Sequence, residues 1–497
     1  MESACVRHTD MPGTSKLYSD FLYHPERVTA FYPSPPAHLN QRVTVDFPAD
    51  RRQAIVAALA EINPGSPLLD QLAQPGTVAV VTGQQVGLFG GPLYTVFKAL
   101  TAVHLARQLT AQGTPAVPVF WVATEDHDFE EIDHTWTLDA ARMPVKLTAK
   151  GDHQPQQPVG RVRITELPAV DDEMVRRHYR VGATFGEAFI GLVRELLGDH
   201  EVLFLDPLRP SIRQIAAPFL AAAAARSNEL NDRVVERSKA LTAAWYHAQV
   251  LFDGKGSSLF FVLEGGRRKP LKAADVTAFT GAPEQLSPNA LLRPVMQDFL
   301  LPTVAMIGGP AEIAYLAQSA VLYEALLGRQ PVALPRAGFT LLDARAAKLM
   351  DRYRLRLPDL MRPEASVREQ IAAHLAPPAL QQTFTDATAE LKITLDRVEQ
   401  ALAGFDRTLV DAFATSRRKI AHQLAKSQAK AARELMRRSD REQTDSTYLI
   451  NEIFPHRHLQ ERFYSILPFL AQHGPDLVGR VYDNIHVDCF DHHVLPL

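Results

Sequence analysis

The sequence is poor in cysteine, with only Cys5 and Cys489 among 497 residues. Two thiols near opposite ends of a chain exclude a disulfide framework and favour a reducing compartment. Long apolar runs are also missing: the longest, Ile215 to Ala225, is far shorter than the roughly 20 residues of a membrane span. Residues 1–16 contain no apolar segment of the kind found in signal peptides. We therefore expect a cytoplasmic protein with no membrane partner.

The charges nearly cancel, since 53 lysine and arginine residues face 56 aspartate and glutamate residues, a net charge of −3. Nucleic-acid-binding proteins usually carry a strongly basic face, so we expect no nucleic-acid partner. Hydrophobic residues make up 46% of the chain and charged residues 22%, as in ordinary globular proteins. A chain of 497 residues exceeds the size at which one core stops growing, which predicts two or three domains.

The segment Val78 to Lys98 contains the first candidate site. Val78 to Val81 is a β-branched run typical of a strand buried on both faces of a parallel sheet, and Leu93 to Gln108 predicts a helix. A strand, a glycine-rich turn and a helix N-terminus can together bind an anion through backbone N–H groups. The spacing is neither G-x-G-x-x-G nor a P-loop, so a turn needed only for packing stays open as the alternative. The turn holds Gly83, Gln84, Gln85, Gly87, Gly90 and Gly91.

A second buried-strand run, Pro118 to Ala123, leads directly into an acidic cluster around one imidazole. Ligands of open α/β sheets bind beyond the carboxyl ends of the strands, so this cluster is expected at the same edge as the glycine turn. A solvated loop is the alternative, but several carboxylates around one imidazole repel one another and need a reason to be together. The cluster consists of Glu125, Asp126, His127 and Asp128.

A third segment repeats the strand, turn and helix pattern at Gly308-Gly309-Pro310, with a predicted helix from Ala311 to Leu327. Glu312 and Tyr315 share one face of that helix and could contact an amine substrate, although an acidic residue there also caps the helix. Upstream, Arg293 offers a planar two-pronged donor suited to a carboxylate.

Beyond the core, the residues from Thr383 to Arg438 carry an apolar stripe at heptad-like spacing, with no proline and one glycine. Such a stripe predicts one long helix that pairs as a coiled coil in a homodimer. Packing of that helix within its own chain is the alternative. We expect a core over residues 1–375 with insertions near 140–200 and 250–285, a coiled-coil helix over 376–440, and a segment over 441–497 that packs back on the core.

Two local predictions concern these outer regions. Val250 to Glu264 predicts a β-hairpin with its turn at Asp253 to Ser257. Cys489 lies in a stretch from His486 to His493 with metal-ligand residue types, but its spacing matches no zinc pattern. We therefore expect no metal site.

Three long blocks resemble the bacillithiol synthase family: TGQQVGLFGGPLYTVFKAL, PVFWVATEDHDFEEIDH, and the run from Ser287 to Gln318. The resemblance covers nearly the whole chain. It implies an α/β fold with a Rossmann-like parallel sheet core, connecting insertions, and a long C-terminal coiled-coil helix used in dimerisation. It also implies a ligase that joins the carboxyl group of cysteine to the amine of glucosaminyl-malate, with these two small molecules as partners.

Amide formation requires a deprotonated amine, and a positioned base typically contributes about 10²–10⁴-fold. Asp126 and His127 are the leading candidates for that base, and Glu125 and Asp128 would orient the imidazole or the sugar hydroxyl groups. The residues expected to bind substrate are Gln84, Gln85, Gly87, Gly90, Gly91, Tyr94, Lys98, Asn289, Arg293, Gln297, Asp298, Gly308, Gly309, Glu312 and Tyr315.

A carboxylate must be activated before an amine attacks it, so ATP or another nucleotide is a possible cofactor. The glycine turn accommodates a phosphate, but no motif specifies adenine or Mg²⁺, and the cofactor stays unknown. Two other functions stay open. One is a nucleotidylyltransferase or aminoacyl-adenylate-forming enzyme acting on another substrate. The other is a coiled-coil ligand-binding protein without catalysis.

Overall fold

A five-stranded parallel sheet forms the centre of the computed structural model, which describes residues 4–40, 43–253, 256, 258–374 and 376–497. All neighbouring strands in this sheet are parallel. In spatial order they are β13 (Val332–Pro335), β12 (Thr303–Gly308), β2 (Val78–Gln84), β3 (Ala116–Val122) and β8 (Leu203–Leu205). In chain order, β2, β3 and β8 follow one another toward one edge of this sheet, and β12 and β13 then lie on the other side of β2. The strand order therefore reverses between β2 and β12, the point where α/β sheets bind ligands.

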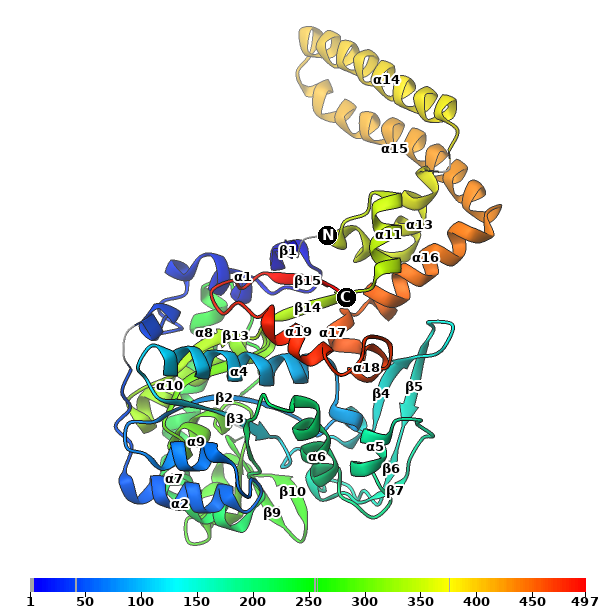
Figure 1. Cartoon of the computed structure of the whole chain (residues 1–497). Helices are drawn as coiled ribbons and strands as arrows, with labels where there is room; N and C mark the ends of the chain where they lie inside the picture. The colour runs from blue at the N-terminus through cyan, green and yellow to red at the C-terminus, as the bar shows by residue number, and fades with distance from the viewer. Residues whose placement is uncertain (1–3, 41–42, 254–255, 257, 375) are drawn as a thin grey trace.

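Helices cover both faces of the sheet, which explains why most residues of its strands are apolar on both faces (Figure 1). Phe120 packs with α4 (Tyr94–Ala111) and α6 (Phe185–Leu197). Its neighbour Trp121 points to the opposite face, as alternate residues of a strand must. That face is covered by α2 (Ala49–Ala60), α7 (Pro210–Ala225), α9 (Arg293–Leu300) and α10 (Pro310–Leu327), with α1 (Lys16–Tyr23) and α3 (Pro67–Ala73) nearby. The predicted α/β core is confirmed.

Two insertions interrupt the sheet. The first follows β3 and contains β4 (His134–Leu138), β5 (Pro144–Thr148), β6 (Lys150–Gly151), β7 (Ile164–Glu166) and α5 (Glu173–His178). The second follows β8 and contains α8 (Ser227–Ala243) and a small sheet of β10 (Arg267–Pro270), β9 (Phe260–Glu264) and β11 (Leu286–Pro288).

The β-hairpin of the second insertion lies further along the chain than the sequence pattern predicted. It consists of β9 and β10, joined by Gly265 and Gly266, which both have positive φ angles (58° and 77°). Positive φ at both central positions is typical of a type I′ two-residue hairpin turn, which glycine adopts readily, so this glycine pair sets the turn. The prediction of a turn at Asp253 to Ser257 is therefore wrong where it can be tested, and residues 254, 255 and 257 lie outside the described residues.

The two ends of the described chain meet in a second sheet, where β15 (His492–Pro496) pairs with both β1 (Ala4–Val6) and β14 (Gly338–Leu342). A separate hydrophobic cluster joins α11 (Ala344–Tyr353), α12 (Leu357–Leu360), α13 (Glu364–Ala373) and α16 (Asp440–Ile453). The chain then returns to the Rossmann-like core through α17 (Gln460–Phe463), α18 (Leu467–His473) and α19 (Leu477–Asp483).

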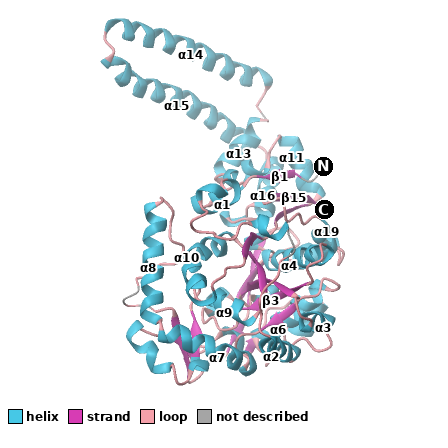
Figure 2. Ribbon diagram, turned by 90° about the vertical axis from the view of Figure 1, so that its left-hand side faces the viewer, coloured by secondary structure: helices cyan, strands magenta, loops and turns pink. Residues whose placement is uncertain are grey.

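The predicted long C-terminal helix is instead two helices, α14 (Pro378–Phe405) and α15 (Thr408–Arg437), which run side by side away from the body (Figures 1 and 2). The helix stops at Asp406, whose backbone is extended and whose carboxylate accepts the N–H of Thr408 at 2.8 Å. The prediction of one continuous helix is therefore wrong, because a local capping motif ends it halfway.

The hairpin of α14 and α15 buries part of the apolar stripe within the chain. Leu395 is only 7% exposed, and Arg417 of α15 bridges two acidic residues of α14, Asp396 and Glu399. Other apolar side chains on the same two helices face solvent: Ile393, Val398, Phe405, Leu409 and Ile420. Among the described residues, no helix combines the length and the apolar character needed to cross a membrane.

Candidate active site

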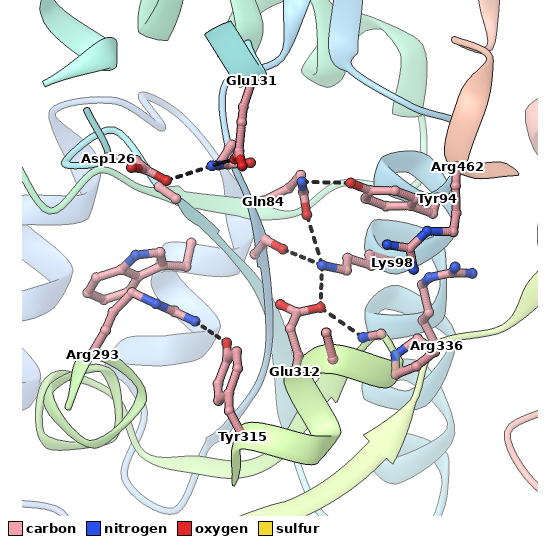
Figure 3. A pocket seen from close by; sticks show the side chains of 17 residues that line it. Gln84, Tyr94, Lys98, Asp126, Glu131, Arg293, Glu312, Tyr315, Arg336 and Arg462 are labelled. Atoms are coloured by element: carbon pink, nitrogen blue, oxygen red, sulfur yellow. Dashed lines mark hydrogen bonds and ion pairs between the residues drawn. The ribbon is translucent and has the colours of Figure 1, made fainter. Parts of the chain in front are cut away.

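A cavity of about 430 Å³ opens at the carboxyl edge of the sheet, where the strand order reverses between β2 and β12 (Figure 3). Its walls come from all three sequence segments that suggested a site, together with the chain after β13 and α17. The lining residues are Gly83, Gln84, Gln85, Tyr94, Lys98, Trp121, Ala123, Asp126, Glu131, Arg293, Gly309, Pro310, Ala311, Glu312, Tyr315, Arg336 and Arg462.

Lys98 lies at the centre of the floor and is only 3% exposed. Its Nζ donates to the carbonyl oxygen of Gly83 (3.0 Å) and to Oε1 of Gln84 (2.9 Å), and pairs with Oε2 of Glu312 (2.5 Å). Burial lowers the pKa of Lys98, and the ion pair with Glu312 opposes that effect. Gln84 in turn donates to the hydroxyl of Tyr94 (3.0 Å), so one polar network ties α4 to the end of β2.

Gln85 organises the acidic wall. Its Nε2 donates to Oδ2 of Asp126 and to Oε2 of Glu131, both at 2.6 Å. One amide therefore holds two carboxylates that would otherwise repel each other. Oδ1 of Asp126 also accepts the backbone N–H of His127 at 2.7 Å, which fixes the orientation of the carboxylate. These contacts give Gln85 a clear role beyond packing.

Arg293 forms the opposite wall. Its guanidinium donates to the hydroxyl of Tyr315 (2.7 Å) and to Oε1 of Gln297 (3.4 Å), and lies 5.9 Å from the ring centroid of Trp121. Burial raises the pKa of Tyr315 to about 12, so its phenol stays protonated at neutral pH. Within the described residues Arg293 has no carboxylate partner.

Gln297 and Asp298 are fully buried behind Arg293 and do not line the cavity. Asp298 accepts from the hydroxyl of Tyr323 (2.5 Å) and from Gln297 (3.3 Å). Gln297 therefore supports Arg293 directly, and Asp298 in turn accepts a hydrogen bond from Gln297.

The sequence pattern missed two arginine residues that complete the basic wall. Arg336 follows β13 and forms a buried two-pronged ion pair with Glu461 of α17 (2.8 and 2.5 Å). This pair places the neighbouring Arg462 above the cavity, 6.0 Å from the ring centroid of Tyr94. The side chain of Arg462 is exposed, and its guanidinium makes no hydrogen bond or ion pair to the other described residues. Arg336 could have been predicted only from its position directly after a buried strand. The sequence around Arg462 contains no pattern that would place it at the site.

A second cavity of about 470 Å³ adjoins the first and shares Trp121, Ala123, Asp126 and Arg293 with it. Asn289 lines this second cavity, and its Oδ1 also accepts the N–H groups of Leu291 (2.9 Å) and Leu292 (3.1 Å). Arg268 lies there 3.8 Å from the ring centroid of Phe261. The shared wall means that two substrates could meet at Asp126 and Arg293.

The four residues of the acidic cluster have different surroundings. Glu125 is buried and forms an ion pair with Arg213, which also donates to three backbone carbonyl groups. Asp128 is exposed and lines neither cavity. Only Asp126 faces both cavities.

His127 also lines neither cavity. Its Nδ1 lies 3.3 Å from the guanidinium of Arg268, which can only donate, so this nitrogen is assigned as an acceptor. Burial and the nearby Arg268 lower the pKa of His127, so the imidazole is neutral at pH 7. With its free lone pair already engaged, His127 is poorly placed to act as a base.

The glycine residues divide between cavity and packing. Gly83 and Gly309 line the cavity, whereas Gly308 packs under the side chain of Glu312. Gly87, Gly90 and Gly91 lie outside the cavity lining. Gly90 has φ +86° and faces side chains of α6, so this part of the turn packs against a helix.

The chain matches two family models end to end. One, described as "Bacillithiol biosynthesis BshC, N-terminal Rossmann-like domain", covers residues 1–337, and the other, "Bacillithiol biosynthesis BshC, C-terminal coiled-coil domain", covers residues 339–497.

Curated relatives are similar over their whole length. A protein of Solibacter usitatus (strain Ellin6076) is 46% identical and one of Koribacter versatilis (strain Ellin345) is 34% identical, with 100% and 99% of both chains covered. Each bears the name "Putative cysteine ligase BshC". Family models that span both parts of the chain and relatives aligned from end to end establish that this chain belongs to the bacillithiol biosynthesis BshC family.

Proposed function

We propose that this protein is a ligase that joins the carboxyl group of L-cysteine to the amine of glucosaminyl-malate, the last step in making bacillithiol. The observation that carries this proposal is the division of charge across one cavity. Two guanidinium groups, Arg293 and Arg462, have no carboxylate partner among the described residues, and they share the cavity with the carboxylates of Asp126 and Glu131.

The basic wall suits the anionic ends of both substrates. Malate carries two carboxylates, and guanidinium groups bind carboxylates through paired, charge-assisted hydrogen bonds. Arg462 is exposed at the rim, where it can capture a malate carboxylate from solvent. Arg293 is held from behind by Gln297 and Tyr315, which gives the fixed geometry needed to orient a bound carboxyl group.

The acidic wall suits the amine. A glucosaminyl ammonium group would be attracted to Asp126 and Glu131 and would have to lose a proton before attack. Asp126 faces both cavities and is the base we assign, with its second oxygen fixed by Gln85. One proton leaves the ammonium nitrogen for Oδ2 of Asp126, and the freed electron pair forms the new bond to the carbonyl carbon of an activated cysteine. The bond from that carbon to the leaving group then breaks, the leaving group departs with its electron pair, and the nitrogen loses its second proton to solvent.

The cysteine carboxyl group must carry a leaving group, since an amine does not displace oxide from a free carboxylate. A nucleotide could supply it as an acyl phosphate or adenylate. Ala311, at the start of α10, lies in the cavity wall together with Arg336 and Arg462, and such a helix N-terminus favours phosphate.

Reconstitution with purified protein tests the proposal. We expect bacillithiol, followed by mass spectrometry, when cysteine, glucosaminyl-malate and a nucleoside triphosphate are combined, together with release of phosphate or pyrophosphate. Pyrophosphate release that requires another acid in place of cysteine would instead indicate an adenylate-forming enzyme with a different substrate. Substrate binding without turnover under every nucleotide tried, together with unchanged bacillithiol in cells that lack the gene, would contradict a ligase.

A further inference from the structure

The only two cysteine residues of the chain lie next to each other in space, together with a buried histidine. Cys5 is on β1, Cys489 lies just before β15, and His493 is on β15. One sulfur or nitrogen atom from each residue lies within 4.8 Å of the other two. None of the three lines the substrate cavity, so the proposed reaction does not use this cluster.

Strand pairing produces the cluster. In the antiparallel pair of β1 and β15, Cys5 stands directly opposite His493, and its Sγ lies 3.4 Å from Nδ1 of the imidazole. On the other side of His493, β14 places Phe339 against the ring at 5.3 Å. His493 is 3% exposed, and its Nδ1 faces the sulfur of Cys5, so one ring nitrogen is directed at the thiol from a buried position.

The geometry points to a site for Zn²⁺ or a similar thiophilic cation, with Cys5, Cys489 and His493 as ligands and a water molecule in the fourth position. A tetrahedral zinc ion has bonds of about 2.3 Å to sulfur and about 2.0 Å to nitrogen, so its ligand atoms stand roughly 3.5 Å apart. The separation of Cys5 and His493 already matches that value. Small side-chain rotations would bring Cys489 into the same sphere.

The ligand set also distinguishes this proposal from a disulfide between the two cysteine residues. A disulfide requires only the two sulfur atoms, and the imidazole would then have no role. Two thiols and a neutral imidazole are instead a common donor set for zinc, and binding would release the two thiol protons to solvent. Because β1 has only three residues and pairs only with β15 among the described strands, the metal would fasten the N-terminal strand to the C-terminal one.

Metal analysis of the full chain tests this inference. We purify the protein in the presence of Zn²⁺ and without chelators. Elemental mass spectrometry should then find one zinc ion for each protein chain. Both thiols should resist a thiol reagent under native conditions and become reactive once a chelator removes the zinc. Replacement by Co²⁺ should give the intense visible absorption of a tetrahedral site with thiolate ligands.

Cys5→Ser is the key variant, because Cys5 is exposed and its loss should leave the fold intact. Loss of a side chain that only orients a metal ligand typically costs about 10–100-fold in metal affinity, so loss of this ligand itself should cost at least about tenfold. His493→Asn should act likewise, and His422→Asn, an exposed histidine of α15, should retain the metal. A zinc-free wild type with two freely reactive thiols, or a chain lighter by two hydrogens through a disulfide, would overturn the proposal.

Discussion

Lys98 of α4 and Glu312 of α10 form an ion pair with 2.5 Å between Nζ and Oε2. These two helices follow β2 and β12, the strands between which the sheet order reverses. Glu312 also accepts the N–H of Gly309 at 2.8 Å, so it caps α10 and pairs with Lys98 at once. The pair therefore joins the two halves of the core under the candidate site.

Lys98→Met should lower the free energy of unfolding by about 3 kcal/mol, because it leaves the carboxylate of Glu312 without its partner. This is the lower end of the roughly 3–5 kcal/mol lost when one partner of a buried ion pair is removed, since Glu312 keeps partial solvent access. The double variant with Glu312→Gln should lose less than the sum of the two single variants, since neither charge is then left alone. Urea unfolding of all four proteins measures this. Additivity within about 0.5 kcal/mol would show that the two side chains do not interact.

Asp126→Asn should reduce turnover by at least about 10²-fold with an unchanged melting temperature, because an amide cannot accept the ammonium proton. Asp128→Asn is the matched control, since this neighbouring carboxylate is exposed and lines neither cavity. Steady-state kinetics on the two folded variants separates them. If Asp126→Asn turned over at the wild-type rate, Glu131 would become the candidate base.

Arg462→Ala should raise the KM for glucosaminyl-malate by about 10–100-fold, the effect of losing a charged hydrogen bond worth about 1.5–3 kcal/mol. The exposed position of Arg462 predicts little change in stability. Arg441→Ala removes a comparable exposed arginine from α16 and should leave the KM unchanged. Equal KM values for both variants would exclude Arg462 from substrate binding.

We propose that exposed apolar residues of the α14–α15 hairpin pair two copies of the chain. Ile393→Lys combined with Ile420→Lys would bury unpaired ammonium groups at that interface and should halve the mass seen by sedimentation. Thr394→Lys, a charge added at an exposed polar position of α14, should leave the dimer intact. Leu395→Lys should instead unfold the hairpin, because Leu395 packs within it. A wild type that is monomeric at micromolar concentration would contradict the dimer.

Acid should weaken the junction between Arg336 and Glu461. Burial alone would raise the pKa of Glu461, but the ion pair and hydrogen bonds with Arg336 lower it to about 2. Because this value lies below that of the unfolded chain, the stabilisation is complete above about pH 4.3 and is lost as the pH falls toward 2. The free energy of unfolding should therefore decrease more between neutral pH and about pH 3 for the wild type than for Glu461→Gln. Parallel losses in the two proteins would contradict the low pKa.

Much of the core could be predicted because its signals are local. β2 and β3 are apolar on both faces, which only a sheet covered by two helical layers permits, and the glycine and proline residues after β2 and β12 mark where helices begin. Residues that follow neighbouring parallel strands are expected at the same edge of the sheet. The cavity at that edge is indeed lined by Gln84, Gln85, Asp126 and Glu312. The full-length matches confirm the resemblance to the family. That resemblance suggested which reaction to expect, but it did not predict how the side chains of the site are arranged.

Tertiary structure decided the rest, because those features depend on contacts between distant residues. A heptad stripe does not reveal whether its partner is another chain, and the cap at Asp406 folds it back on itself. Acidic residues adjacent in sequence diverge, so that Asp126 enters the cavity while Glu125 pairs with Arg213. Arg462 reaches the site only through the ion pair of Arg336 with Glu461, and Cys5 meets His493 only because β15 pairs with β1. The spacing of residues along the chain does not predict such contacts, because the packing of whole helices and strands determines them.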